Sequence, residues 1–275
     1  YMRDQAVARG LERRRNTNTY KVVHLCIDEK SLFKGQHYVT IFYDGQTGAV
    51  LEVVEHRTKV ATSLGFKQLD KYIPLSSIQV VTMDMWDAFK STTEKYIPHA
   101  DIVHDRFHLA QYLNKAVDIT RRAENKSLVK RNDERLKKTK YLWLKNPENL
   151  SLKQELLQKE LIEDESLKTV KAWRLKENFK QFFESKDGLQ AQTFFDSWKD
   201  EVNQTENKAL IKVGDMLQNH LERILTYFNH KVTNAMAECQ NSSIQQIKAK
   251  ARGFKSAKAF RTSILFFCGK LEFYP

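Results

Sequence analysis

The sequence predicts an α/β fold in which a mixed sheet, three antiparallel strands followed by parallel strands with helical crossovers, carries a large all-α insertion. Three observations predict this class. Residues 21–55 contain three short segments rich in β-branched and aromatic side chains. Residues 62–122 alternate between helical and strand-like patterns, and residues 121–230 show helical patterns only.

The first three strands are expected at residues 21–28, 37–43 and 49–55, which are apolar and rich in Val, Ile, Phe and Tyr. Residues 44–48 (DGQTG) supply turn-forming residues between the second and third strands. Short connections join strands that run in opposite directions, so these segments predict an antiparallel meander.

The next elements alternate in type. Pro74 and Pro98 each end a helix, because proline cannot continue the hydrogen-bonded backbone. Thr62 and Ser63 are expected to open the first of these helices. Strands separated by helices are typical of parallel crossovers. In chain order we expect a helix at 62–72, a strand at 78–84, a helix at 86–96, a strand at 100–104 and a helix from 106 to 122.

The rest of the chain is expected to be helical. The stretch 121–230 contains its own apolar set, with Trp173, Phe179 and Trp198 among its members, which predicts a separate small core. Two last helices follow, at 234–252 and from Ser256 to about Phe267. The expected segments are residues 1–20 (the tail of a helix and a polar linker), 21–120, 121–230 and 231–275.

Composition narrows the function classes. The 275 residues are 41% hydrophobic and 29% charged with only 9 Gly and 4 Pro, which excludes collagen-like, low-complexity and fully disordered chains. No apolar run approaches about 18 residues, so no transmembrane helix is expected, and the polar, basic start shows no signal peptide. The net charge of +12 favours a polyanionic partner, most often nucleic acid, over a surface that is basic only for solubility.

The three cysteines, Cys26, Cys239 and Cys268, lie far apart and form no CxxC pair. Their spacing predicts neither a disulfide framework nor a cysteine zinc site, and it favours a reducing, intracellular compartment.

Three carboxylates lie where this order of elements would bring them to one site. Asp28 ends the first apolar strand, Asp84 ends the fourth, and Asp105 follows the fifth, three residues before His108. Carboxylates at strand ends can supply the oxygen ligands that Mg²⁺ requires. Each also has an ordinary interpretation: Asp84 as a helix N-cap, Asp28 with Glu29 as a solvated turn, and Asp105 with His108 as a local hydrogen bond.

Glu238 is the candidate late in the chain. At about 100° per residue, it shares a helix face with Ser242, Gln245 and Arg252. A solvated face would explain the basic run near it, but a carboxylate followed by cations is also what metal and phosphate in one groove require. The candidate DNA-binding residues are Lys248, Lys250, Arg252, Lys255, Lys258 and Arg261.

Several short motifs, in order, carry a family resemblance. Between about Ile27 and Phe267 the sequence resembles the DDE-type transposases of bacterial insertion sequences, specifically the ISL-three family. The DRFH motif at 105–108 and the AECQNS motif at 237–242 are specific in combination. The matching stretches are 27–29 (IDE), 34–40 (KGQHYVT), 83–85 (MDM) with 88–89 (AF), 97–100 (IPHA), 103–108 (VHDRFH), 234–242 (NAMAECQNS), 247–248 (IK), 252–254 (RGF) and 260–261 (FR).

The resemblance implies an RNase H-like fold with a helical insertion before the helix that bears the final glutamate. It implies that Asp28, Asp84 and Glu238 are the catalytic, metal-binding triad. Asp105 and His108 resemble the accessory DxxH element of related transposases, and Asp105 is also the rival for the second aspartate. Asp84 is preferred because the fourth strand of an RNase H-like sheet lies beside the first.

The sequence departs from the family pattern in two places. Cys239 stands where members often have Gly, which does not touch the chemistry. The family's N-terminal cysteine-containing and helix-turn-helix regions are not expected among these 275 residues, and residues 1–20 are expected to be a remnant of that DNA-binding region.

The implied activity is DNA strand cleavage and strand transfer with two Mg²⁺ ions, for which Mn²⁺ is an expected substitute. The implied partners are double-stranded DNA, as transposon ends and target, and further copies of the chain assembled on it, with no membrane. The expected location is the bacterial cytoplasm, at the nucleoid. Basic residues in 121–145 and 248–261 would hold backbone phosphates. The alternatives are an RNase H-like nuclease or resolvase that does not join DNA, and a domesticated DNA-binding protein.

Overall fold

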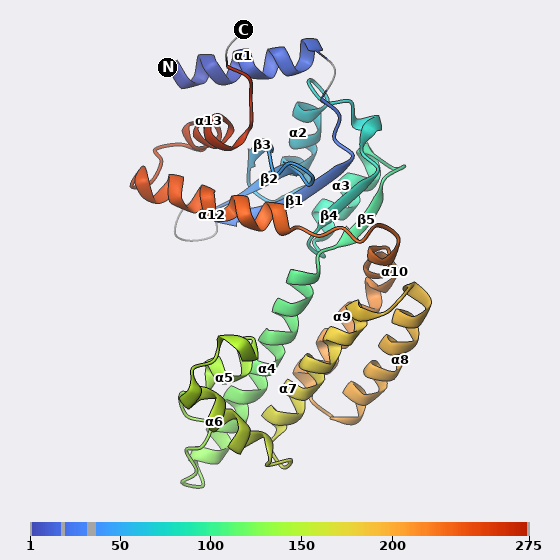
Figure 1. Ribbon diagram of the computed structural model, residues 1–275, viewed down its shortest axis with the longest axis vertical. Helices are drawn as coiled ribbons and strands as arrows, with labels where there is room; N and C mark the ends of the chain where they lie inside the picture. The colour runs from blue at the N-terminus through green and yellow to red at the C-terminus, as the bar shows by residue number, and fades with distance from the viewer. Residues whose placement is uncertain (1, 18–19, 32–36, 274–275) are drawn as a thin grey trace. The chain divides into compact units, whose positions relative to one another are not determined.

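A computed structural model describes residues 2–17, 20–31 and 37–273, so the motif residues 34–36 lie outside the described part. The chain divides into two compact units (Figure 1). The sheet unit comprises residues 1–105 and 230–275, and the helical unit comprises residues 106–229. The sequence places the start of the helical segment at residue 121, whereas the helical unit begins at Arg106, because one unbroken helix starts there.

The sheet unit is built on one five-stranded mixed sheet. Its strand order is β3-β2-β1-β4-β5, antiparallel among the first three strands in the chain and parallel between β1, β4 and β5. The predicted α/β class with a mixed sheet is confirmed. The strands are β1 (His24–Ser31), β2 (Tyr38–Asp44), β3 (Val50–Glu55), β4 (Val80–Met83) and β5 (Asp101–His104).

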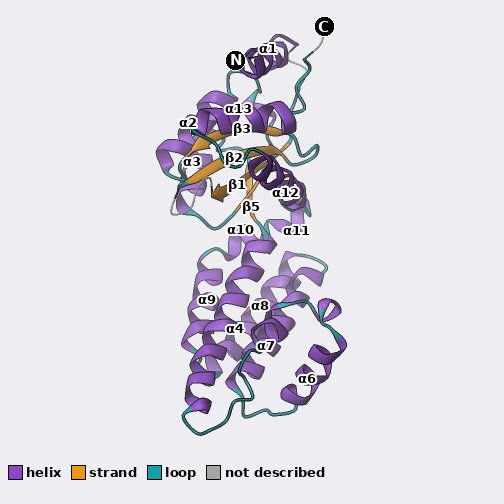
Figure 2. Ribbon diagram, turned by 90° about the vertical axis from the view of Figure 1, so that its left-hand side faces the viewer, coloured by secondary structure: helices purple, strands orange, loops and turns teal. Residues whose placement is uncertain are grey.

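Helices cover both faces of the sheet, which is why the strands read as nearly continuous apolar runs. On one face, Leu25 and Ile27 of β1 pack with Phe66 of α2 and Phe89 of α3. The opposite face packs against α12 and α13, and α1 packs on α13 (Figure 2). The helices of this unit are α1 (Met2–Thr17), α2 (Lys59–Leu69), η1 (Leu75–Ser77), α3 (Asp87–Tyr96), α12 (Ala235–Lys250) and α13 (Ala257–Cys268).

Local capping fixes where these helices begin. Ser256 caps α13 by accepting a hydrogen bond from the Ala259 backbone N–H, as its position in the sequence predicts. The expected start of α2 at Thr62 is wrong, because Thr58 is the N-cap and its side chain accepts from the Ala61 N–H. Thr62 instead lies inside the helix, where its hydroxyl donates to the Thr58 carbonyl.

The helical unit is organised around α4, which packs against α5, α7 and α9. An aromatic cluster including Phe179, Phe182 and Trp198 fills its core, with the Phe179 and Trp198 ring centroids 4.7 Å apart. Its elements are α4 (Arg106–Val129), α5 (Lys140–Leu144), η2 (Pro147–Asn149), α6 (Leu152–Ile162), α7 (Lys168–Asn178), η3 (Phe179–Glu184), α8 (Gly188–Gln204), α9 (Lys208–Asn219) and α10 (Leu221–Leu225). The short helix α11 (Tyr227–His230) ends at the unit boundary.

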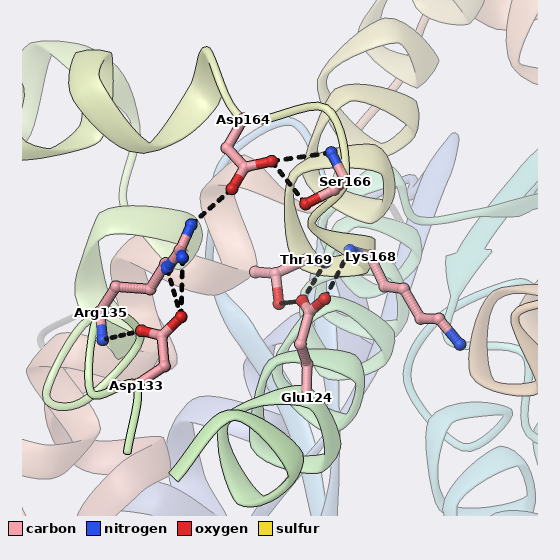
Figure 3. Close-up of polar contacts among 7 residues, drawn as sticks. All are labelled: Glu124, Asp133, Arg135, Asp164, Ser166, Lys168 and Thr169. Atoms are coloured by element: carbon pink, nitrogen blue, oxygen red, sulfur yellow. Dashed lines mark hydrogen bonds and ion pairs between the residues drawn. The ribbon is translucent and has the colours of Figure 1, made fainter. Parts of the chain in front are cut away.

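A distant carboxylate caps α7, whose own N-cap residue, Leu167, has no side chain able to do so. Glu124 of α4 accepts hydrogen bonds of 2.7 Å from the backbone N–H groups of Lys168 and Thr169 and one of 2.6 Å from the Thr169 hydroxyl (Figure 3). These bonds satisfy orphan donors at the start of α7 and fix that helix to α4.

Candidate functional site

The candidate site begins at one edge of the sheet, where three aspartates follow paired strand residues. Ile27 of β1 pairs with Met83 of β4, and Met83 pairs with His104 of β5. Asp28, Asp84 and Asp105 are the next residues in each case. Because neighbouring strands lie about 4.8 Å apart, Asp28 and Asp84 are on adjacent strand paths, and Asp105 is one strand further away.

The positions of Asp28 and Asp84 relative to their neighbouring strand and helix differ from those that the sequence predicts. Asp28 does not end its strand, because β1 continues to Ser31 in pairing with β2. Asp84 is not the N-cap of α3, since Trp86 holds that position. Instead, the Asp84 carboxylate accepts a 2.6 Å hydrogen bond from the Met85 backbone N–H. The capping interpretation of Asp84 is therefore wrong.

Side-chain alternation places Asp28 on the face of the sheet that α12 covers, the same face as Cys26. Asn241 of α12 reaches it there: the amide Nδ2 donates to Asp28 Oδ2 over 2.6 Å. The Tyr43 hydroxyl of β2 donates to Asn241 Oδ1 over 2.9 Å. Burial raises the pKa of Tyr43 well above its usual value, with a further contribution from Asp28, so this hydroxyl keeps its proton.

A second contact holds the start of α12 to the sheet. Asn234, the N-cap of α12, is buried, and its Oδ1 accepts a hydrogen bond from the Thr82 hydroxyl of β4. His24 Nε2 lies 2.9 Å from the same hydroxyl. Burial lowers the pKa of His24 to about 4, so this imidazole is neutral near pH 7. Thr82, the strand residue that binds Asn234, lies two residues before Asp84.

Glu238 lies on α12 between these two anchors, one turn before Asn241, and is exposed. In the described residues, no group of three or more His, Cys, Asp or Glu side chains is arranged to hold a metal ion. The structure therefore brings Asp28 and Asp84 to adjacent strands but does not gather them with Glu238 into a metal-binding group. The carboxylates themselves are the donor type that Mg²⁺ selects.

Glu29 adds a further acidic group to this edge. Its carboxylate forms a 2.7 Å ion pair with Arg57. Burial raises the pKa of Glu29, Arg57 opposes that effect, and the nearby Asp84 and Asp28 raise it further. Three acidic residues, Asp28, Glu29 and Asp84, therefore lie near one another at this edge of the sheet.

Asp105 and His108 fall in different units. Asp105 is buried at the end of the first segment of the sheet unit, where its backbone N–H donates to the Met83 carbonyl over 3.0 Å. His108 belongs to α4 in the helical unit, and its ring contacts Phe107.

The predicted phosphate-binding cations divide into two groups. Four of them are exposed on α12, α13 and the loop between them: Lys250, Arg252, Lys255 and Lys258. Lys248 is half-buried and donates to the Ser31 carbonyl over 3.0 Å. Arg261 is already engaged within the protein: its guanidinium binds the fully buried carboxylate of Glu52 through two hydrogen bonds of 2.5 and 2.7 Å.

Internal pairing also occupies part of the basic stretch 121–145. Arg121 forms a 2.8 Å ion pair with Asp118. Arg135 binds both Asp133 and Asp164 (Figure 3). These two arginines therefore contribute to the packing of the helical unit.

Sequence reasoning did not find the link through Asn241 and Tyr43. A signal for it exists in α12, where Asn234, Asn241 and Lys248 recur at seven-residue spacing and all three bind the sheet. Ala237 and Ile244 lie on the same stripe and are buried. The stripe of α12 that faces the sheet thus contains polar as well as apolar residues. A search for apolar periodicity alone does not detect such a stripe.

Comparison with known proteins defines the class. A transposase family model, of the ISL3 (ISL-three) type, matches residues 25–264. The chain belongs to this family, and the predicted family is confirmed.

Curated relatives carry the same name. The chain is 27% identical over 244 residues to the transposase for insertion sequence element IS1001 of Bordetella parapertussis. It is 22% identical over 256 residues to the transposase for insertion sequence element IS1557 of Mycobacterium tuberculosis strain H37Rv. These alignments cover 87% and 85% of the chain but only 59% and 57% of the relatives. Within the described residues, no helix has the length and apolar character needed to cross a bilayer.

Proposed function

We propose that this chain is the catalytic portion of a DNA transposase with an RNase H-like fold, in which Asp28, Asp84 and Glu238 bind divalent metal ions. The observation that carries the proposal is the pairing of Ile27 with Met83, which places the first two aspartates on adjacent parallel strands. The helix bearing Glu238 crosses the same face and contacts Asp28 through Asn241.

The chemistry of the three carboxylates fits Mg²⁺, a hard cation that takes oxygen ligands. Bound there, a pair of such ions would stabilise the attacking and leaving oxygens of an in-line displacement at a DNA phosphate. The protein's part is to supply ionised carboxylates on rigid strands. The reaction needs no side-chain nucleophile, because no covalent bond forms between protein and DNA. Exposed Lys250, Arg252, Lys255 and Lys258 would hold the DNA backbone without reading sequence.

The test is a Mg²⁺-dependent cleavage and strand-transfer assay on labelled duplexes that carry the insertion-sequence end. Asp28→Ala, Asp84→Ala and Glu238→Ala should each abolish cleavage and leave DNA binding largely intact. The matched control is Asp87→Ala, because Asp87 is an exposed acid in the first turn of α3. Asp87→Ala should cleave at the wild-type rate.

The outcomes separate the competing assignments. Wild-type cleavage by any of the three alanine variants removes that residue from the triad. Total loss in Asp105→Asn together with an active Asp84→Ala would make Asp105 the second aspartate. Cleaved DNA without joined product would show a nuclease or resolvase instead of a transposase.

A further inference from the structure

The side chain of Asn241 links α12 to the first aspartate of the proposed site. We propose that Asn241 is a positioning residue, held by Tyr43, that orients the Asp28 carboxylate for divalent metal binding. This inference rests on the proposed function, because it assigns Asp28 to a metal site. It is carried by the contacts at 2.9 Å between Tyr43 and Asn241 and at 2.6 Å between Asn241 and Asp28.

The chemistry of the three groups fixes which way the amide points. An ionised carboxylate only accepts hydrogen bonds, so the amide nitrogen of Asn241 must face Asp28. The amide oxygen then faces Tyr43, whose hydroxyl donates to it. With the amide reversed, its oxygen would lie against the carboxylate and two acceptors would oppose each other. The chain Tyr43 to Asn241 to Asp28 therefore has one favourable direction.

This link sets the plane of the Asp28 carboxylate. Oδ2 accepts from Asn241, and Oδ1 accepts from the Glu29 backbone N–H over 2.7 Å. A carboxylate that accepts a hydrogen bond at each oxygen cannot rotate freely. Such outer contacts orient ligands in metal sites and tune their affinity.

Asn241 is itself well supported. It lies between the buried residues Ala237 and Ile244 of α12. Asn234 and Lys248, seven residues before and after it, also bind the sheet. The amide is therefore carried by a helix that is fixed at three points, which is how a rigid scaffold holds a polar group in place.

Asn241 would make the same contacts if it only held α12 to the sheet. The test must therefore measure the affinity of the protein for the metal ion. Mn²⁺ binding to the full chain is followed by electron paramagnetic resonance, and Mg²⁺ binding is followed by competition with Mn²⁺. Asn241→Leu keeps the approximate volume and removes the donor. It should weaken Asp28-dependent binding about 10- to 100-fold, the usual effect of losing an outer contact to a ligand. Gln246→Leu is the matched control, an amide exposed on the same helix, and should bind like wild type.

The hydroxyl of Tyr43 supplies the second arm. Tyr43→Phe removes one oxygen atom and should weaken binding in the same direction but by less. The double variant should match Asn241→Leu alone, because both act through one route. An anchoring role without orientation would lower thermal stability and leave the metal affinity of the folded protein unchanged. If Asn241→Leu does not fold, Tyr43→Phe decides.

Two failures remain distinguishable. If Asp28→Ala removes metal binding while folded Asn241→Leu or Tyr43→Phe binds like wild type, the positioning role is overturned and the proposed function stands. If wild-type protein shows no metal binding that depends on Asp28, the proposed metal site fails, and the positioning role is overturned with it.

Discussion

Replacing Arg261 with methionine should destabilise the sheet unit and change DNA affinity little. Arg261 belongs to a basic run, but its Nε and Nη2 atoms bind the Glu52 carboxylate at 2.5 and 2.7 Å. Glu52 is 0% exposed, while the Arg261 side chain is 33% exposed. In Arg261→Met, Glu52 would keep the Val53 backbone N–H at 2.7 Å and the Tyr72 hydroxyl at 3.1 Å as donors but lose its cation.

The magnitude follows from that burial. Removing one partner of a buried ion pair costs about 3–5 kcal/mol, because an uncompensated charge stays behind. For a protein of this size that corresponds to a fall in Tm of roughly 6–20 °C. Replacing both partners, as in Glu52→Met with Arg261→Met, should recover most of the loss, since an apolar pair of similar volume is often neutral or better.

The assay is calorimetric unfolding beside a salt-dependent DNA-binding titration. Lys258→Met is the control, because Lys258 lies one turn before Arg261 on α13 and is exposed. It should leave Tm unchanged and lower the salt dependence of DNA binding by about one phosphate contact. Arg261→Met with wild-type Tm and weakened DNA binding would refute the reasoning and restore Arg261 to the DNA interface.

Two further predictions concern pH and helix capping. The folded-state pKa of His24 is lowered by burial, and by His230, against the raising effect of Asp44, from 6.5 to about 4. The unfolded chain therefore binds the extra proton between pH 6.5 and 4, and about 3 kcal/mol of stability should be lost as pH falls through that window. Urea unfolding against pH measures this loss, and His24→Gln with an unchanged acid slope would contradict it. Glu124→Gln should destabilise the helical unit by about 1–3 kcal/mol, because a charged acceptor for Thr169 and the start of α7 is lost. Hydrogen exchange at the first turn of α7 reports the change, and unaltered protection there would contradict it.

Local patterns were enough to predict most of the sheet unit. The apolar runs at 78–84 and 100–104 contain β4 and β5, because a strand covered on both faces must be apolar throughout. The start of α2 was missed because Thr58 and Thr62 are both acceptable caps. The predicted start of the helical segment at residue 121 falls inside α4, which runs without a break from Arg106, where the helical unit begins.

The candidate site was predictable only in its strand part. The family resemblance implies that the fourth strand lies beside the first, and β1 and β4 are neighbours in the sheet, so the proximity of Asp28 and Asp84 could be predicted. The partners Asn241 for Asp28 and Glu52 for Arg261 are about two hundred residues apart in the chain. No local propensity encodes such pairs, since they depend on how α12 and α13 settle on the sheet.

The contacts that hold α12 to the sheet determine where Glu238 lies relative to the two aspartates of the proposed triad. Asn234 holds the start of the helix to Thr82 of β4, and Asn241 holds the next two turns to Asp28 of β1. Glu238 lies between these anchors, three residues from Asn241, a separation that puts Cβ atoms about 5–6 Å apart on a helix. At about 100° per residue it is displaced by roughly 60° from the anchored stripe, so it borders the face that meets the sheet. Because Asn234 and Asn241 bind α12 to the two strands that lead into Asp28 and Asp84, the proposed triad predicts that Glu238 joins the other two carboxylates by rotation of its long side chain.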